Sequence, residues 1–200
     1  MKPKTWNYTR NRIDLAIYYA KLAHAKQKRK YTDEPYFVHC QQVAELVKNK
    51  GGTESMIVAA YLHDIVEDTD FTHNSIRHWF GDEVSNLVYW LTDISRPEDG
   101  NRKTRKEIDL NHIIKAPTEA KIIKCADLIS NAHSIVQHDP DFAKVFLAEM
   151  RKILEAFDTK HRLQDIAFAV LENCEEFIYE GKELLEYDND VENTCSCCHW

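Results

Sequence analysis

The sequence predicts an all-α fold, a single helical bundle with extra helices toward its C-terminal end. Only five glycines and five prolines occur in 200 residues, so few positions interrupt a helix. Apolar residues recur at spacings of three and four over long stretches, the period of a helix face that packs on a core. No linker rich in Gly, Ser or Pro divides the chain, and we therefore expect one domain over residues 1–185 and an acidic, Cys-rich tail over residues 186–200.

Turn residues and helix-start residues separate the expected helices. Gly51-Gly52 ends the second helix, and the Thr53 side chain suits the start of the third. Asp99-Gly100 precedes the sixth, Pro117 begins the seventh, and Asp139-Pro140 separates the seventh from the eighth. The remaining boundaries follow the apolar period. The nine expected helices cover residues 11–28, 35–50, 53–65, 74–80, 82–92, 103–114, 117–138, 141–157 and 161–179.

A group of polar residues ends the third expected helix: His63-Asp64, followed one turn later by Glu67-Asp68. In a continuous helix, neighbours such as His63 and Asp64 point apart, whereas residues four apart share a face. The apolar run at 56–62 directs this helix into the core, so we expect the cluster at the floor of a cleft. Buried carboxylates require a counter-ion. For an isolated His-Asp pair, the alternative is a solvated acidic helix end.

Two further polar residues lie in apolar stripes elsewhere, His39 and Asp127. Taken singly, each also fits a core polar group satisfied by a backbone partner. Together with His63 and Asp64 they form a set of two histidines and two aspartates. Imidazole with carboxylate suits Mn, Fe, Ni or Zn better than Ca, and four protein ligands leave two octahedral positions for water and substrate.

Five segments of the chain resemble the hydrolase half of the RelA/SpoT family, and the chain is similar in size to the small alarmone hydrolases within the HD superfamily. The likeness extends from about residue 22 to about residue 138. Its segments, in family order, are Ala23-His24-Ala25-Lys26-Gln27-Lys28-Arg29-Lys30, Glu34-Pro35-Tyr36-Phe37-Val38-His39, the run from His63 to Asp68, residues 80–93, and Lys124-Cys125-Ala126-Asp127 with Asn131.

The resemblance implies an HD-domain hydrolase with a metal-binding site for Mn²⁺, although other divalent transition metals fit the same ligands. The implied metal ligands are His39, His63, Asp64 and Asp127. A bound divalent ion lowers the pKa of water from about 15.7 to near neutrality and polarises a phosphoryl oxygen. The resemblance assigns orientation and deprotonation of the attacking water to Glu67 and Asp68.

The implied substrate is a purine nucleotide alarmone of the stringent response. The reaction is removal of the 3′-diphosphate from ppGpp or pppGpp, or from a relative such as (p)ppApp, to give GDP or GTP (or ADP or ATP) and pyrophosphate. The resemblance assigns the base and ribose to Arg29 and Lys30, and a further substrate contact to Asn131. Arg29 can stack on a purine and fork to phosphate, whereas Lys30 is a point charge. The other interpretation of this basic segment is a solvated helix end that complements the macrodipole.

The chain departs from the family pattern at two points. Tyr89-Trp90 replaces the usual acidic-Gly step, for which core packing is the preferred interpretation and a reshaped wall of the nucleotide pocket the alternative. Ala132-His133 follows Asn131 where relatives have Leu-Arg or Met-Arg, which leaves the base preference open. Residues 96–106 are a charged loop leading into a helix or, alternatively, a source of replacement phosphate contacts.

Two other functions remain open. The departures keep alive an HD phosphatase that acts on another 2′- or 3′-phosphorylated nucleotide, such as NADPH. The last alternative is a non-catalytic nucleotide-binding regulator, against which the presence of both Glu67 and Asp68 argues, because a binder needs no water-activating pair.

Composition and charge favour a cytoplasmic enzyme. The chain is 44% hydrophobic with a net charge of −7, which argues against nucleic acid as a partner. No run approaches the roughly 20 apolar residues of a membrane span, and the N-terminus lacks an apolar signal core. The apolar stripe after residue 141 fits core packing or, alternatively, a homo-oligomer interface.

The cysteines divide into two groups. Cys40, Cys125 and Cys174 lie in apolar helical contexts, which suits reduced core thiols. The end of the chain, residues 195–200, carries three cysteines and a histidine without a second ligand pair at zinc-finger spacing. We interpret it as part of a mobile acidic tail rather than as a metal site.

Overall fold

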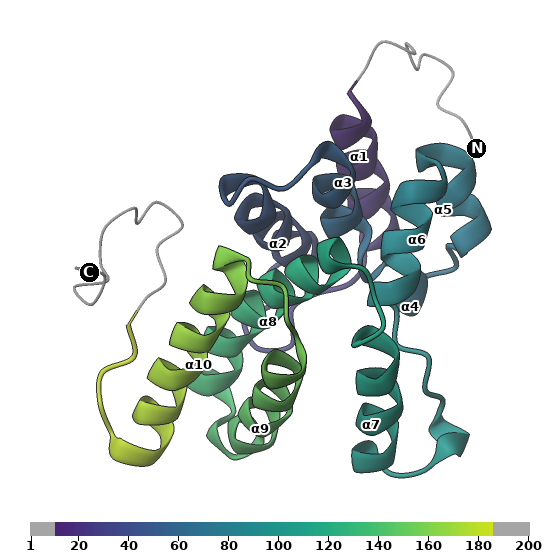
Figure 1. Ribbon diagram of the computed structural model, residues 1–200. Helices are drawn as coiled ribbons and strands as arrows, with labels where there is room; N and C mark the ends of the chain where they lie inside the picture. The colour runs from purple at the N-terminus through teal and green to yellow at the C-terminus, as the bar shows by residue number, and fades with distance from the viewer. Residues whose placement is uncertain (1–10, 186–200) are drawn as a thin grey trace.

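The computed structural model describes residues 11–185, and this part of the chain is helical without a β-sheet (Figure 1). The all-α prediction is therefore confirmed. In order, the elements are α1 (Arg12–Ala23), α2 (Phe37–Asn49), α3 (Glu54–Leu62), α4 (Ile65–Asp68), α5 (His73–Phe80), α6 (Asp82–Leu91), the 3₁₀ turn η1 (Pro97–Asp99), α7 (Arg102–Ile113), α8 (Thr118–His138), α9 (Pro140–Ala156) and α10 (Arg162–Glu180).

Helix α3 lies at the centre of the bundle. Every residue from Ser55 to Leu62 is buried, and the helix packs against α1, α2, α6 and α8. Its start is fixed by Thr53, whose hydroxyl accepts a hydrogen bond from the backbone N–H of Met56. An apolar surface on all sides of a helix requires neighbours on all sides, which explains its central position.

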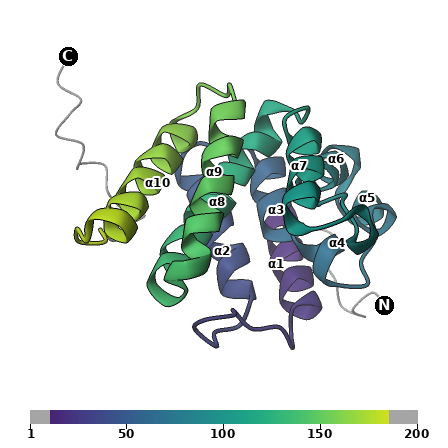
Figure 2. The same ribbon diagram turned by 90° about the horizontal axis from the view of Figure 1, so that it is seen from below.

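The C-terminal helices α9 and α10 pack along α8, away from α1 and α3 (Figure 2). The α9 stripe contributes to the core through Leu147, Met150 and Leu154, so core packing is confirmed for these residues. Val145, on the same helix, is 46% exposed. The interpretation as a homo-oligomer interface stays a prediction.

Two helix predictions were wrong, both close to the candidate site. The first expected helix ends at Ala23, and the chain then forms an irregular loop joined by hydrogen bonds from Arg29 N to Glu34 O and from Tyr36 N to Gln27 O. The third expected helix divides between α3 and α4, with Asp64 at φ −95° and ψ −2°. This break turns Asp64 back toward His63, so the two side chains converge rather than point apart.

Helix α7 stands apart from the rest of the bundle. Its principal contacts are with α6 and η1, and it runs beside α9 (Figures 1 and 2). Polar and apolar side chains from α6, α7, α8 and α9 line a cleft of about 1,060 Å³. Among the described helices, none is long and apolar enough to cross a bilayer. The tail prediction for residues 186–200 lies outside the described residues.

Candidate metal centre and its cleft

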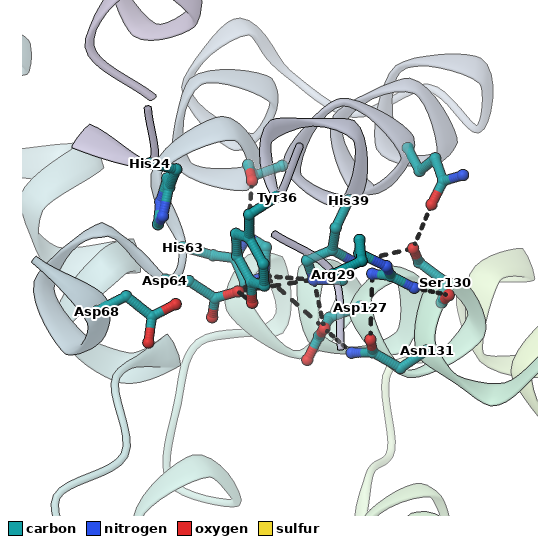
Figure 3. Close-up of polar contacts among 12 residues, drawn as sticks. His24, Arg29, Tyr36, His39, His63, Asp64, Asp68, Asp127, Ser130 and Asn131 are labelled. Atoms are coloured by element: carbon teal, nitrogen blue, oxygen red, sulfur yellow. Dashed lines mark hydrogen bonds and ion pairs between the residues drawn. The ribbon is translucent and has the colours of Figure 1, made fainter. Parts of the chain in front are cut away.

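Three of the expected metal ligands come together where α2, α3 and α4 meet (Figure 3). His39 lies in the first turn of α2, His63 follows α3, and Asp64 precedes α4. One ligand atom from each lies within 4.8 Å of the others. His63 Nε2 is 2.9 Å from Asp64 Oδ2 and 3.2 Å from His39 Nε2.

The fourth expected ligand reaches the same point from the middle of α8. Asp127 Oδ1 lies 3.2 Å from His39 Nε2 and 3.7 Å from His63 Nε2. Residues from three distant stretches of the chain therefore surround one small volume. Both imidazoles and the Asp127 carboxylate are buried, and Asp64 is half-buried.

Hydrogen bonds on the outer side of each imidazole determine what it presents to the centre. His63 Nδ1 is 2.8 Å from the carbonyl oxygen of Ala60, which can only accept, so Nδ1 carries the hydrogen. His39 Nδ1 donates to Ser130 Oγ, whose own hydrogen goes to Gln42 Oε1. In the neutral imidazoles both Nε2 atoms therefore have a lone pair for the centre, the orientation that hydrogen-bond partners on the outer side give to metal-binding histidines.

The carboxylates of the cluster also attract positive charge. Burial disfavours charge on His63, Asp64 and Asp127. The interaction of His63 with the two carboxylates outweighs this effect, so the pKa of His63 is held well above its ordinary value. The pKa of Asp64 is held well below its ordinary range despite burial, chiefly by His63. Without a metal ion, a proton on His63 therefore supplies the positive charge beside the two carboxylates. Two Nε2 lone pairs and two carboxylates fit a divalent transition metal in the same place.

Helix α8 orients Asp127 through neighbours on the same helical face. Lys124 Nζ donates to Asp127 Oδ2 at 2.8 Å, and Asn131 Nδ2 donates to Asp127 Oδ1 at 2.7 Å. The spacings of three and four residues place all three side chains together. Burial opposes the charge of Lys124, but Asp127 and Asp93 outweigh it and raise its pKa. Lys124 therefore remains a cation beside the centre.

The two expected water-activating carboxylates point to different sides. Glu67 lines the cleft, where its Oε1 accepts a hydrogen bond from the backbone N–H of Asp93 at 2.7 Å. Its side chain is accessible to solvent from the cleft, yet the surrounding protein desolvates it, and together with Asp93 and Asp64 raises the pKa of its carboxyl to about 7. Asp68 instead accepts a hydrogen bond from Gln27 Nε2 at 2.8 Å.

The two expected base-binding cations lie in different places. Arg29 reaches the site: its guanidinium is 3.4 Å from Asn131 Oδ1 and 3.2 Å from the carbonyl oxygen of Ser130. Lys30 lies farther out, where its ammonium is bonded to the hydroxyl of Tyr31 and lies 3.4 Å from Asp139 Oδ2. The structure thus brings Arg29 and Asn131 together with Asp127, and leaves Lys30 at the edge.

The cleft extends from this centre between α7 and α9. Arg102 of α7 makes a two-point ion pair with Glu149 of α9, with contacts of 3.0 and 2.8 Å, and thereby bridges the two walls.

Trp90 lies on the cleft wall, stacked on His112 with ring centroids 4.7 Å apart, whereas Tyr89 is 45% exposed. The preferred interpretation of Tyr89-Trp90 as core aromatics is therefore wrong for Tyr89. The cationic residues of the cleft are Arg102, Lys103, Lys106, Lys124, Lys144 and Lys152.

Sequence reasoning missed several residues of the site. Tyr36 stood in a family-like segment without an assigned role, yet its hydroxyl donates to Asp64 Oδ2 at 2.5 Å. Asp93 contacts Lys106 Nζ at 2.5 Å and helps to set the charge around Glu67. The available signal for Tyr36 was a hydroxyl-bearing aromatic residue three positions before the candidate ligand His39. Asp93 ends the family-like segment at 80–93, but no local pattern assigned it a role.

The fold and this cluster define an all-helical protein with a buried His/Asp site suited to a divalent metal. Comparison with protein families gives the same result, since the HD domain family matches residues 16–161. The chain belongs to the HD domain family.

Similar proteins carry related names. The chain is 32% identical over 127 residues to the guanosine-3′,5′-bis(diphosphate) 3′-pyrophosphohydrolase MESH1 of Drosophila melanogaster, which covers 62% of this chain and 69% of that protein. It is 31% identical over 189 residues to the guanosine-3′,5′-bis(diphosphate) 3′-pyrophosphohydrolase of Aquifex aeolicus, covering 87% of this chain and 27% of that protein. The chain spans about a quarter of the length of this and other bacterial relatives.

Solved structures share the fold. A metazoan ortholog of SpoT, described as hydrolysing ppGpp, superposes with a TM-score of 0.72 at 23% identity, covering 86% of this chain and 97% of that one. A protein of Listeria monocytogenes superposes with a TM-score of 0.60 at 25% identity, covering 72% of this chain and 99% of that one.

Proposed function

We propose that the protein hydrolyses the 3′-diphosphate of ppGpp, pppGpp or a related purine alarmone, with Mn²⁺ held by His39, His63, Asp64 and Asp127. The observation that carries this proposal is the convergence of these side chains on one buried point beside Glu67, at the end of a cleft lined by cations. The names of the Drosophila and Aquifex relatives supply the substrate class.

In this mechanism the chain's own residues bind the nucleotide and move one proton. When bound, the metal ion lowers the pKa of a water molecule and polarises a phosphoryl oxygen. Glu67 has a pKa near neutrality, which suits a group that accepts the proton of the attacking water. Asp68 orients that water from the other side, and Tyr36 remains a hydrogen-bond donor to Asp64 because burial and the carboxylates raise the pKa of its phenol.

The two sides of the cleft suit the two ends of a nucleotide with phosphates at both positions. We propose that Arg29 lies against the base and that Asn131 contributes a polar contact beside it. Lys30 contacts the substrate from the rim in this proposal. In this proposal the phosphates at the 5′ end meet the cations of α7 and α9. The role of residues 96–106 as a source of phosphate contacts is supported by Arg102, Lys103 and Lys106, which line the cleft.

Purified protein incubated with Mn²⁺ and ppGpp tests the proposal. We expect GDP and pyrophosphate in equal amounts, separated by ion-exchange chromatography, and no product after metal removal with a chelator. Asp127→Ala serves as the inactive variant. If neither ppGpp nor its adenine analogue is hydrolysed by metal-loaded protein, the proposed function is wrong.

One observation favours a second candidate, an HD phosphatase for another nucleotide such as NADPH. Trp90 lies on the cleft wall next to His112, where it adds an aromatic surface to the nucleotide pocket. A panel of nucleotides scored for orthophosphate and pyrophosphate separates the two activities. Release of orthophosphate from a 2′-phosphorylated dinucleotide, without pyrophosphate from ppGpp, supports the second candidate.

A further inference from the structure

A buried histidine lies beside the candidate site without belonging to the metal cluster. His24 follows the end of α1, and only 2% of its surface is exposed. In Figure 3 its side chain lies next to Tyr36, on the side of the cluster where Asp68 projects. Its Nε2 atom is buried without a hydrogen-bond partner in the described part of the chain. An unpaired buried nitrogen costs free energy that an apolar side chain in this position would not. The hydrogen-bonding role of the imidazole therefore lies in its other nitrogen, Nδ1.

The Nδ1 atom belongs to a short chain of hydrogen bonds that ends at Asp68. It lies 2.7 Å from Gln27 Oε1, and Gln27 Nε2 lies 2.8 Å from Asp68 Oδ2. An ionised carboxylate only accepts hydrogen bonds, so the amide nitrogen of Gln27 must face Asp68 and its oxygen must face His24. His24 therefore donates through Nδ1, and this donation selects one of the two orientations of the Gln27 amide.

The His24 ring also supports the carboxylate of Asp64, through Tyr36. Its ring packs against the ring of Tyr36, with centroids 5.0 Å apart and an interplanar angle of 37°. The Tyr36 hydroxyl donates to Asp64 Oδ2. His24 thus contacts Gln27 and Tyr36. Within the described residues, these two side chains connect the loop at 24–36 to α4, through hydrogen bonds to Asp68 and to the N-cap residue Asp64.

Asp68 needs such support because it is exposed. Among the described residues, Gln27 is the one hydrogen-bond partner of its carboxylate. An exposed side chain with a single partner samples several rotamers, and a group that orients water must be held within narrow limits.

We propose that His24 is a positioning residue that acts through Gln27 to hold the Asp68 carboxylate toward the attacking water. The inference rests on the proposed hydrolytic function, and it assigns a role to the His24 and Gln27 side chains of the loop after α1. The hydrogen-bond chain is a property of the protein with or without substrate.

The first test observes the hydrogen bond directly. In ¹⁵N-labelled full-length protein, we expect the His24 ring to show an Nδ1–H resonance that is protected from exchange with solvent. Gln27→Met keeps the length of the side chain and removes the acceptor, so this protection should be lost. A His24 ring protonated only at Nε2, or equal protection in Gln27→Met, overturns the proposal whatever the protein's activity.

The second test measures the consequence for turnover. Gln27→Met and His24→Leu should each lower kcat about tenfold with KM changed less than threefold, the size of effect typical of residues that orient a functional group. Bound Mn²⁺ should be unchanged. The matched control is Gln41→Met, which removes a similar amide–carboxylate hydrogen bond of 2.7 Å to Glu45 on the exposed side of α2 and should leave kcat unaltered.

A double-mutant cycle with Asp68→Asn separates positioning from a purely structural role. If Gln27 acts through Asp68, adding Gln27→Met to Asp68→Asn lowers single-turnover rates no further. A full tenfold loss in the Asp68→Asn background, or wild-type kcat in both single variants, overturns the proposal. Absence of any turnover in the wild-type protein instead contradicts the proposed function, and the resonance test then still decides whether the hydrogen-bond chain exists.

Discussion

At the scale of single residues, the site is a balance of buried charges. Two aspartates and two imidazoles converge, Lys124 neutralises one side, and Glu67 remains on the cleft wall with a raised pKa. Types and spacings in the sequence predicted the four candidate ligands, because each stands out from an apolar stripe. The sequence could not predict Lys124, Tyr36 or Asp93 as partners, since their roles depend on which faces meet after folding.

Glu67 should control the acidic side of the pH–activity profile. Its pKa is raised from 4.5 to about 7 by desolvation from the surrounding protein and by neighbouring carboxylates. A base works only when deprotonated, so activity should rise with pH through this group. A metal ion in the neighbouring His/Asp site lowers the pKa of Glu67. In metal-loaded protein, the acidic limb of the pH–activity profile should therefore lie between pH 4.5 and 7.

The measurement is kcat against pH for the wild type and for Glu67→Gln, with bound metal determined in both. The variant should bind metal, lose at least about a hundredfold in kcat and lack the acidic limb. A variant with wild-type kcat and the same limb would show that another group accepts the proton.

Lys124 should stabilise the metal-binding form of Asp127. Removing its ammonium by Lys124→Met leaves Asp127 Oδ2 without its hydrogen-bond donor, and we expect Mn²⁺ affinity to fall about tenfold to a hundredfold. Isothermal titration with Mn²⁺ measures this change. The control is Lys115→Met, which changes an exposed lysine just after α7 and should leave the affinity for Mn²⁺ unchanged. Equal affinity in Lys124→Met and the wild type would contradict this account of Asp127.

At the scale of elements, the departures from prediction occur where helices end. The chain leaves α1 at Ala23 because the loop at 24–36 is held by backbone hydrogen bonds and by Asp33 in the left-handed region, φ 60°. The division of α3 from α4 brings Asp64 back to His63. Helical periodicity locates apolar faces, but it does not report interruptions that depend on contacts with distant segments.

The pairing of α7 with α9 should set the affinity for phosphates in the cleft. Arg102 bridges to Glu149, and Glu149→Gln weakens that pair and leaves the guanidinium available to an anionic substrate. We expect Arg102→Met to raise KM for ppGpp several-fold with a smaller change in kcat, and Glu149→Gln to have the opposite effect on KM. Steady-state kinetics of both variants tests this. Unchanged KM in Arg102→Met would place the phosphates elsewhere.

At the scale of the whole molecule, the all-α class followed from composition and helical period, and the HD type followed from the resemblance of five segments to a known family; the structure and the family comparison agree with both. The separation of α7 from α9, which leaves room for the cleft, could not be predicted from the sequence, because the apolar pattern of one helix does not indicate how far it lies from its neighbours. Nor did the Trp90–His112 stack, which depends on the approach of α6 to α7.

The C-terminal helices should be part of the cooperative core. Met150 is fully buried on α9, so Met150→Ala should lower the free energy of unfolding by about 2–5 kcal/mol. Val145 is 46% exposed on the same helix, and Val145→Ala should change it by less than about 0.5 kcal/mol. Urea unfolding followed by circular dichroism measures both. A small effect of Met150→Ala would indicate that α9 unfolds independently.

A crystal grown with MnCl₂ and measured at the manganese absorption edge tests the central claim most directly. The account predicts one strong anomalous peak among His39 Nε2, His63 Nε2, Asp64 Oδ2 and Asp127 Oδ1, which disappears in Asp127→Ala. Metal-saturated protein with no anomalous density at that position, or with density only on other side chains, would contradict it.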